Sequence, residues 1–261
     1  MSSSLWVSMT GLEAQEKQMS VISNNLANVN TTAFKRDRAS FEDLFYQTEQ
    51  EAGAMANQQN ELPVGLQLGT GVKVTGTEKV FTPGDIKTTG QPLDLAIAGQ
   101  GFFQVQKPDG SIAYTRDGQF QKNADGTLVT MEGLPVQPSI TIPDDATSVS
   151  IGTDGTVSVT QAGSTDSQSL GQLTLVSFVN PCGLKALGGN LYQQTTASGA
   201  PNESIAGQDG LGEIKQHSLE GSNVSVVQEM VDMISTQRAY DMNSKVVSAA
   251  DQMLKEVSQV G

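Results

Sequence analysis

Few side chains of this sequence are suited to nucleophilic, acid–base or metal chemistry. The 261 residues include one histidine, His217, and one cysteine, Cys182. A zinc site of the Cys/His type needs three or four such ligands, and a Ser-His-Asp enzyme would have to use His217. No Gly-x-Ser-x-Gly turn marks a nucleophile beside that histidine. We therefore expect no catalytic residue, no metal site and no cofactor, with His217 solvated or interfacial and Cys182 an ordinary turn residue.

Two loops come near to ligand-binding motifs without completing them. Gly99-Gln100-Gly101 follows an expected strand, but Gln104 stands where a dinucleotide fingerprint needs its third glycine, and no helix follows. Residues 121–132 match several positions of an EF-hand calcium loop, but the first position is Gln121 and both flanks are expected to be strands. Both loops are more simply predicted to be glycine-containing β-turns.

Composition and charge exclude further classes of protein. The net charge is −13, so the chain lacks the basic face that nucleic acid requires, and an anionic membrane would repel it. No apolar run approaches the ~18 residues of a transmembrane helix. The N-terminus shows no cleaved secretory signal. Aromatic residues make up only 5 %, which disfavours a carbohydrate-binding groove.

The N-terminal region predicts one helix, over residues 4–29. An apolar residue recurs every seven positions, and such a repeat keeps one seam of a helix facing a partner helix. The seam consists of Leu5, Leu12, Met19 and Leu26, with Met9 and Ile22 on the same side. Asn24, Asn25 and Asn28 gather at the end of this helix, where their amides are expected to bond neighbouring backbone and set its register.

The C-terminal region predicts a longer helix, over residues 226–258. Its apolar residues fall on two stripes, so it is expected to have more than one packing partner. Val227, Val231 and Ile234 form one stripe, and Met242, Val246, Ala249, Met253 and Val257 form the other. Charges spaced i,i+4 predict three ion pairs on the two helices, which are Glu13–Lys17, Asp241–Lys245 and Asp251–Lys255.

The middle of the chain predicts β structure. Apolar residues alternate in 139–142, 156–159 and 172–175. Asp-Gly pairs at 109–110, 117–118, 125–126 and 154–155 are expected to supply the positive φ angles of tight hairpins. Residues 93–185 are therefore predicted to form an antiparallel sandwich or small barrel. The polar, glycine-punctuated segment 47–72 is predicted to be a long loop or ribbon.

Several of these segments resemble the bacterial flagellar axial proteins of the rod and hook, and the resemblance covers the whole chain. The run 24–35, NNLANVNTTAFK, resembles their N-terminal signature, and Gly99–Phe103 resembles the entry to their shared β-domain. Residues 222–224, 229–231 and 237–240 resemble their C-terminal signature. Two residues, Ala33 and His217, stand where many members have glycine, so the resemblance raises the question of local turn geometry at both.

The resemblance implies a multidomain α+β fold in three layers. The N- and C-terminal helices, residues 1–33 and 222–261, are expected to pair as a coiled-coil-like terminal domain. An intermediate domain of β structure and ribbon is expected from 34–92 and 186–221, including the long loop 47–72. Residues 93–185 are expected to form the outer all-β domain.

The resemblance also implies a function. Segments 3–6, 62–72 and 199–204 are most similar to rod subunits of the distal segment. We expect a non-enzymatic subunit that self-assembles into the distal rod, a rigid tubular drive shaft that transmits torque from the motor to the hook. A proximal-rod or hook-type subunit is the alternative, and a carbohydrate-binding module or a cell-wall hydrolase is a more distant one.

The same resemblance implies location and partners. The subunit would leave through the flagellar export apparatus without a cleaved signal and lie in the basal body, where the rod crosses the periplasm. Its partners would be further copies of itself in a helical homopolymer, proximal rod proteins, the hook protein, and the ring proteins of the peptidoglycan layer and outer membrane. Neither nucleic acid nor membrane insertion is expected.

The expected assembly residues fall into two groups. The helical tube is expected to use Leu5, Leu12, Met19, Ile22, Asn24, Asn25, Leu26, Asn28, Val227, Val231, Ile234, Arg238, Tyr240 and Met253. Contacts from the ribbon to a neighbouring subunit are expected from Leu62, Leu66 and Leu68, with Pro63 fixing the approach of the chain.

Overall fold

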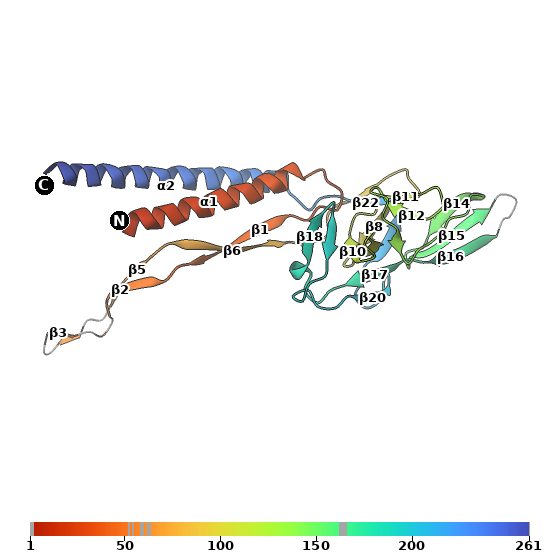
Figure 1. Ribbon diagram of the computed structural model, residues 1–261, viewed down its shortest axis with the longest axis horizontal. Helices are drawn as coiled ribbons and strands as arrows, with labels where there is room; N and C mark the ends of the chain where they lie inside the picture. The colour runs from red at the N-terminus through yellow and green to blue at the C-terminus, as the bar shows by residue number, and fades with distance from the viewer. Residues whose placement is uncertain are drawn as a thin grey trace. The chain divides into compact units, whose positions relative to one another are not determined.

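The chain divides into two compact units in a computed structural model that describes residues 3–51, 53, 55–57, 60–61, 64–161 and 166–260. The helical unit comprises Met1–Ala27, Asp37–Glu78 and Ser225–Gly261, and the β unit comprises Asn28–Arg36 and Lys79–Val224. Helices thus occupy both ends of the chain and strands the middle (Figure 1), which confirms the predicted α+β class. No helix in the described ranges is both long and apolar enough to cross a membrane.

The helical unit consists of two long helices and a β-ribbon. Helix α1 (Ser3–Ala27) packs against helix α2 (Val226–Val260) and against strand β1. The ribbon is antiparallel and pairs β1 (Asp37–Asp43) with β6 (Val72–Lys79), β2 (Tyr46–Gln50) with β5 (Leu66–Gly69), and β3 (Met55–Asn57) with β4 (Asn60–Glu61). The described residues of segment 47–72 therefore form a ribbon, one of the two forms predicted for it.

The β unit is built from short strands around one main core. In chain order the strands are β7 (Ile86–Thr88), β8 (Leu95–Ala98), β9 (Phe103–Gln106), β10 (Ile112–Thr115), β11 (Phe120–Lys122), β12 (Leu128–Thr130), β13 (Val136–Gln137), β14 (Ala146–Ile151), β15 (Thr156–Gln161), β16 (Ser167–Gln172), β17 (Thr174–Ser177), β18 (Lys185–Gly188), β19 (Leu191–Gln193), β20 (Asn202–Ile205), β21 (Glu213–Gln216) and β22 (Ser218–Glu220). A 3₁₀ turn, Pro181–Gly183, lies between β17 and β18.

Strand pairing joins distant parts of the chain. The largest sheet has the order β13-β9-β10-β19-β18, and a second has the order β14-β15-β16. Strand β8, whose first three residues are buried, pairs with β21, and β17 pairs with β20. These pairings cross residue 185, where the sequence suggested that the outer domain ends. The three-domain division itself stays a prediction.

Two local predictions for the β unit need correction. Gly118 has no positive φ angle, although it follows Asp117; a Cβ there would lie 1.8 Å from the carbonyl oxygen of Leu95, so close packing requires the glycine. Residues 139–142 form only an isolated bridge at Thr141 instead of a strand. Their alternation reflects burial of Ile140 and Ile142, whose backbones bond Leu128 and Gly126.

Ala33 and His217 both adopt the left-handed conformation, with φ angles of +56° and +55°. Side chains with a Cβ adopt this conformation at a cost that glycine does not have. The two positions at which many members of the family have glycine are therefore turns whose backbone conformation suits glycine.

A buried ion triad ties the β unit together. The Glu220 carboxylate accepts hydrogen bonds from Lys35 Nζ at 2.6 Å, Arg116 Nε at 2.8 Å and the backbone N–H of Gly84 at 2.9 Å. Lys35 also donates to the Thr82 carbonyl oxygen at 2.8 Å. All three charged side chains are almost fully excluded from solvent. One carboxylate therefore holds segments that the sequence separates by up to 185 residues.

The triad shifts the pKa values of its members. Burial, followed by the nearby charge of Arg116, lowers the pKa of Lys35 from 10.5 to about 8. Burial alone would raise the pKa of Glu220, but the charges of Arg116 and Lys35 outweigh it and hold that pKa below its ordinary 4.5.

Replacing Glu220 by Gln is expected to destabilise the β unit strongly. The change leaves two buried cations without their anion, which costs about 3–5 kcal/mol in comparable sites. Lys35→Met should cost less, because the Arg116–Glu220 pair remains. Urea unfolding followed by far-UV circular dichroism measures the differences. Lys122→Met, which breaks an exposed pair with Asp144, is the control and should change little. A Glu220→Gln loss no larger than that of the control would contradict the role.

Acid titration gives a second readout on the same variant. Because the folded pKa of Glu220 lies below its ordinary value of 4.5, the ionised carboxylate contributes stability above that pH and loses it as the pH falls. The stability gap between wild type and Glu220→Gln should therefore narrow below pH 4.5.

The turn at residue 217 makes a separate prediction. His217 is exposed, so a change there tests backbone conformation more than packing. His217→Gly should be more stable than His217→Ala by about 1 kcal/mol, because only alanine retains the left-handed strain. The same pair of changes at Lys215, in strand β21, should show the opposite sign. Equal stabilities of the two 217 variants would argue against strain at this turn.

Candidate assembly surfaces of the helical unit

Asn25 joins the three parts of the helical unit. Its Nδ2 donates to the Asp37 carbonyl oxygen at 2.9 Å and to Glu229 Oε2 at 3.2 Å, and its Oδ1 accepts from the Asp37 N–H at 2.8 Å. Asn25 and Glu229 are both buried. One amide thus fixes helix α1 against strand β1 and helix α2, which confirms the expectation that an asparagine here bonds neighbouring backbone.

The other two asparagines differ from Asn25. Asn24 is exposed, and its Nδ2 reaches Asp37 Oδ2 at 3.5 Å. Asn28 belongs to the β unit, where its Oδ1 accepts from the Thr31 hydroxyl at 3.1 Å. The three asparagines lie close together in the sequence, but it is the hydrogen bonds of Asn25 that join α1 to both β1 and α2.

The contact between α1 and α2 combines mainly apolar residues of α1 with small and polar residues of α2. Met9, which was expected on the same side of α1 as this seam, is instead 57 % exposed. On α1 the buried residues include Ser8 and Ile22, whereas Leu5, Leu12, Met19 and Leu26 are half-buried. On α2 the buried residues are Glu229, Thr236 and Ala250. The helices approach closely at Gly11, where a Cβ would lie 2.9 Å from Asn243 Nδ2. Small and polar residues therefore occupy the face of α2 that meets α1.

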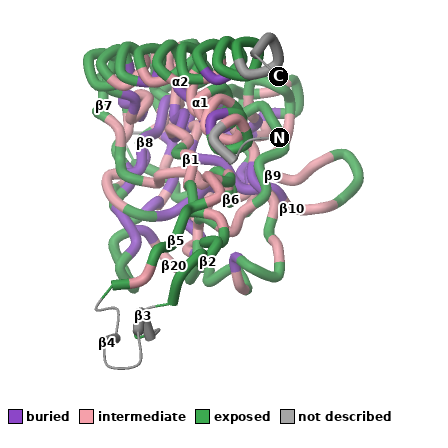
Figure 2. Tube along the Cα trace, turned by 90° about the vertical axis from the view of Figure 1, so that its left-hand side faces the viewer, coloured by how far each residue is buried: buried purple, intermediate pink, exposed green. Residues whose placement is uncertain are grey.

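Both apolar stripes of α2 are left open to solvent. Figure 2 shows the helix coloured mainly as exposed along its length. Val227 is 74 % exposed, Ile234 49 % and Met253 60 %. The other stripe residues with described side chains, and two further residues expected in the tube, are exposed as well; they are Val231, Met242, Val246, Ala249, Arg238 and Tyr240.

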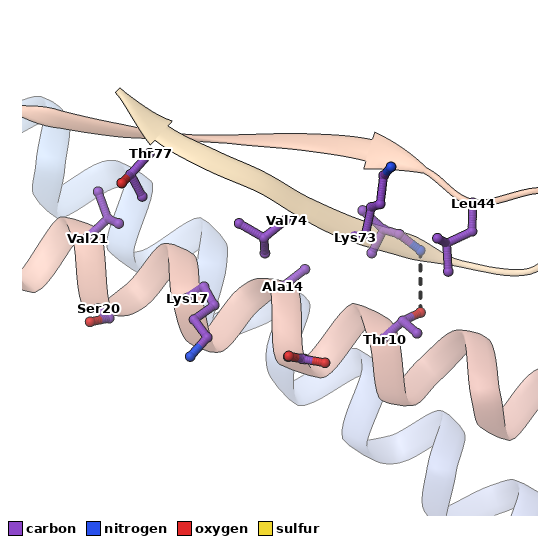
Figure 3. Close-up of a pocket in the computed structure, with 11 residues that line it drawn as sticks. Thr10, Ala14, Lys17, Ser20, Val21, Leu44, Lys73, Val74 and Thr77 are labelled. Carbon is purple, nitrogen blue, oxygen red and sulfur yellow. Dashed lines mark hydrogen bonds between the residues drawn. The ribbon is translucent and has the colours of Figure 1, made fainter. Parts of the chain in front are cut away.

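A groove lies between α1 and the ribbon, with a volume of about 470 Å³. Figure 3 shows Ala14 and Val21 of α1 and Val74 of β6 pointing into this space. The N–H of Val72 donates to Thr10 Oγ1 at 3.4 Å at one end. No sequence pattern predicted this groove, because its two walls come from an α-helix and a strand some sixty residues apart.

The ribbon also presents apolar side chains to solvent. Leu66 and Leu68 lie on β5 and are exposed, as are Phe45 and Tyr46 beside them. Leu62 and Pro63, the other two residues expected to make ribbon contacts, lie outside the described residues. Sequence reasoning missed Phe45, which is 91 % exposed.

The two loops that come near to nucleotide- and calcium-binding motifs make hydrogen bonds within the β unit. Gly99 and Gly101 offer their carbonyl oxygens to Arg116, at 2.7 and 3.1 Å. The Asn123 side chain accepts from the backbone N–H groups of Asp125 and Thr127. Cys182 is exposed, with its Sγ 3.4 Å from the Lys79 carbonyl oxygen. Within the described residues, no cluster of three or more His, Cys, Asp or Glu side chains could hold a metal.

Asn25→Ala should loosen the helical unit. The change leaves the Asp37 backbone groups and Glu229 without this partner, at about 1–3 kcal/mol for each buried group left unsatisfied. Hydrogen exchange at the Asp37 amide should accelerate by a factor of ten or more, since tenfold corresponds to about 1.4 kcal/mol. Asn24→Ala, next along the helix and exposed, is the control. Equal exchange rates in the two variants would show that Asn25 does not fix β1.

Comparison with known proteins matches most of this architecture to one family. Residues 5–35 match the family described as "Flagella basal body rod protein", residues 96–159 the "Flagellar hook protein FlgE/F/G D1 domain", and residues 215–260 the "Flagellar basal body rod FlgEFG protein C-terminal".

Whole-chain relatives agree with these matches. The flagellar basal-body rod protein FlgG of Buchnera aphidicola subsp. Acyrthosiphon pisum is 54 % identical over 98 % of this chain and 99 % of its own. The FlgG proteins of Agrobacterium fabrum and Bacillus subtilis are 47 % and 39 % identical, over 98 % and 97 % of both chains. At such identity over nearly the whole length, the chain belongs to the flagellar basal-body rod proteins of the rod and hook family.

Proposed function

We propose that this rod subunit polymerises through its helical unit to form the distal rod of the flagellum, a rigid tube that transmits torque from the motor to the hook. The observation that carries the proposal is the exposure of both apolar stripes on α2, a helix that already has α1 as its partner. Fully burying a Val, Ile or Met side chain contributes roughly 1.5–3 kcal/mol. Covering these stripes with further copies therefore provides a driving force for assembly.

Within one subunit, the two helices form a coiled-coil-like pair in this proposal. Support comes from the spacing of the less exposed residues on the facing sides, which advance in alternating steps of three and four. On α1 they are Leu5, Ser8, Leu12, Gln15, Met19, Ile22 and Leu26, and on α2 they are Glu229, Asp232, Thr236, Ala239, Asn243 and Ala250, with Val247 beside the last. Polar residues in such a seam fix register at the expense of stability.

The layers of the tube follow from the same proposal. The helices would lie innermost, the segments 34–92 and 186–221 in the middle, and residues 93–185 outside. The exposed leucines of the ribbon, Leu66 and Leu68, would contact a neighbouring subunit. An interface of two different surfaces suits a polymer, because head-to-tail contacts that do not close into a ring generate helical filaments.

Location and partners complete the proposal. The names of the relatives support a place in the basal body and contact with other flagellar components. Export without a cleaved signal, and contacts with proximal rod proteins, the hook protein and the ring proteins, are parts of this proposal drawn from the resemblance. We also propose that the subunit is not an enzyme, since the matched families carry no catalytic description.

Ile234→Asp tests the role of the exposed stripe. A charge placed in a packed apolar contact loses hydration without gaining a partner, so assembly should fail while the β unit keeps its unfolding transition. Electron microscopy of concentrated protein and light scattering against concentration measure assembly. Ser244→Asp adds the same charge to an exposed site on the same helix and should perturb assembly less. Straight tubes of normal length from the Ile234 variant would contradict the proposal.

A further inference from the structure

Glu13 and Lys17 on α1, and Asp241 and Lys245 on α2, are among the charged side chains of the helical unit that form no ion pair with the described residues. All four are exposed. Each pair has the i,i+4 spacing that predicts a bridge within its own helix, but of the three such bridges expected only Asp251–Lys255 forms, at 2.6 Å. These two predictions were wrong, and the charges are free to meet other partners.

Glu13 and Lys17 stand on the rim of the groove between α1 and the ribbon, and its floor is apolar. Ala14, Val21 and Val74 line that floor (Figure 3). At 100° per residue, the groove side of α1 is turned away from the side that carries Ser8 and Ile22 and packs on α2. The chain's own α2 therefore cannot fill the groove while it keeps its place on α1.

Asp241 and Lys245 carry the complementary pattern. Their spacing equals that of Glu13 and Lys17, and in both pairs the acid precedes the base along the chain, so an antiparallel alignment brings Lys17 to Asp241 and Glu13 to Lys245 at once. A parallel alignment brings together only one of these two pairs. In this register the groove wall from Thr10 to Val21 lies opposite residues 237–248 of α2, which include the exposed stripe residues Met242 and Val246 beside the charges.

We propose that this groove is the receiving site for α2 of a second copy of the chain. The incoming helix runs antiparallel to α1, pairs Asp241 with Lys17 and Lys245 with Glu13, and lays Met242 and Val246 on the apolar floor. Groove and stripe are two different surfaces of one unit, which is the kind of contact that an open polymer requires. The inference rests on the proposed function and names the contact through which it operates.

Charge exchange between the two surfaces tests this contact in the full-length protein. Lys17→Glu and Asp241→Lys each place like charges together, so each should raise the critical concentration for assembly roughly tenfold or more, because like-charge juxtaposition is costly at an interface. The double variant restores opposite charges and should return to within about threefold of wild type. Lys185→Glu, an exposed charge reversal in the β unit, is the control. Circular dichroism of dilute protein checks that each variant is folded.

Disulfide cross-linking tests the same contact without changing any charged residue. In a Cys182→Ser background, Val74→Cys and Met242→Cys should form a disulfide between subunits in the polymer and none in dilute monomer. Single variants that assemble normally, a double variant that stays as impaired as the singles, or a cross-link absent from well-formed tubes would overturn the groove contact and leave the polymer intact. Failure of the wild-type chain to polymerise would instead overturn the proposed function.

Discussion

The carboxylate of Glu220 is the interaction on which the β unit depends. It neutralises one of two buried cations and also accepts a backbone hydrogen bond, so four separate segments converge on two oxygen atoms. The triad pairs two cations with one anion in a region shielded from water, where burial, followed by the charge of Arg116, lowers the pKa of Lys35. Such an arrangement defines one geometry because few alternatives satisfy every donor.

The helical unit uses the same strategy with a neutral group. Asn25 binds both backbone groups of Asp37 and the Glu229 carboxylate, so polar contacts fix the position of α1. The exposed apolar side chains of α2 therefore remain available for contacts with other subunits. On α2 the seam inside the subunit contains Thr236 and Asn243, whereas valine, isoleucine and methionine lie on the outside of the helix. The apolar residues of the seam come mainly from α1, such as Leu12 and Ile22. For α2 this inverts the usual distribution, and it suits a helix whose main apolar contacts are made with neighbouring subunits.

The sequence predicted the parts of the fold that depend on local pattern. Both helices have long uninterrupted periodicity, and their ends lie within two residues of those expected. The ion triad was not predictable, because Lys35, Arg116 and Glu220 are isolated charges until strand pairing brings them together. The two missing i,i+4 bridges show a related limit, since spacing permits a bridge while solvent competes for each charge. Of the candidate surfaces, the α2 stripes followed from periodicity, but the groove depended on a helix and a strand distant in sequence.

The pairing of β8 with β21 has a kinetic consequence. Leu95 and Gln216 are partners although more than a hundred residues separate them, so the entropy of closing that loop opposes folding before the contact contributes anything. Local hairpins such as β9–β10 need no such closure and can form early. The core around β8 is completed only when β21 has joined it, and α2 follows within ten residues of β21. During synthesis the polypeptide thus has no finished β unit, and no helical partner for α1, until the segments from β21 onward have been made.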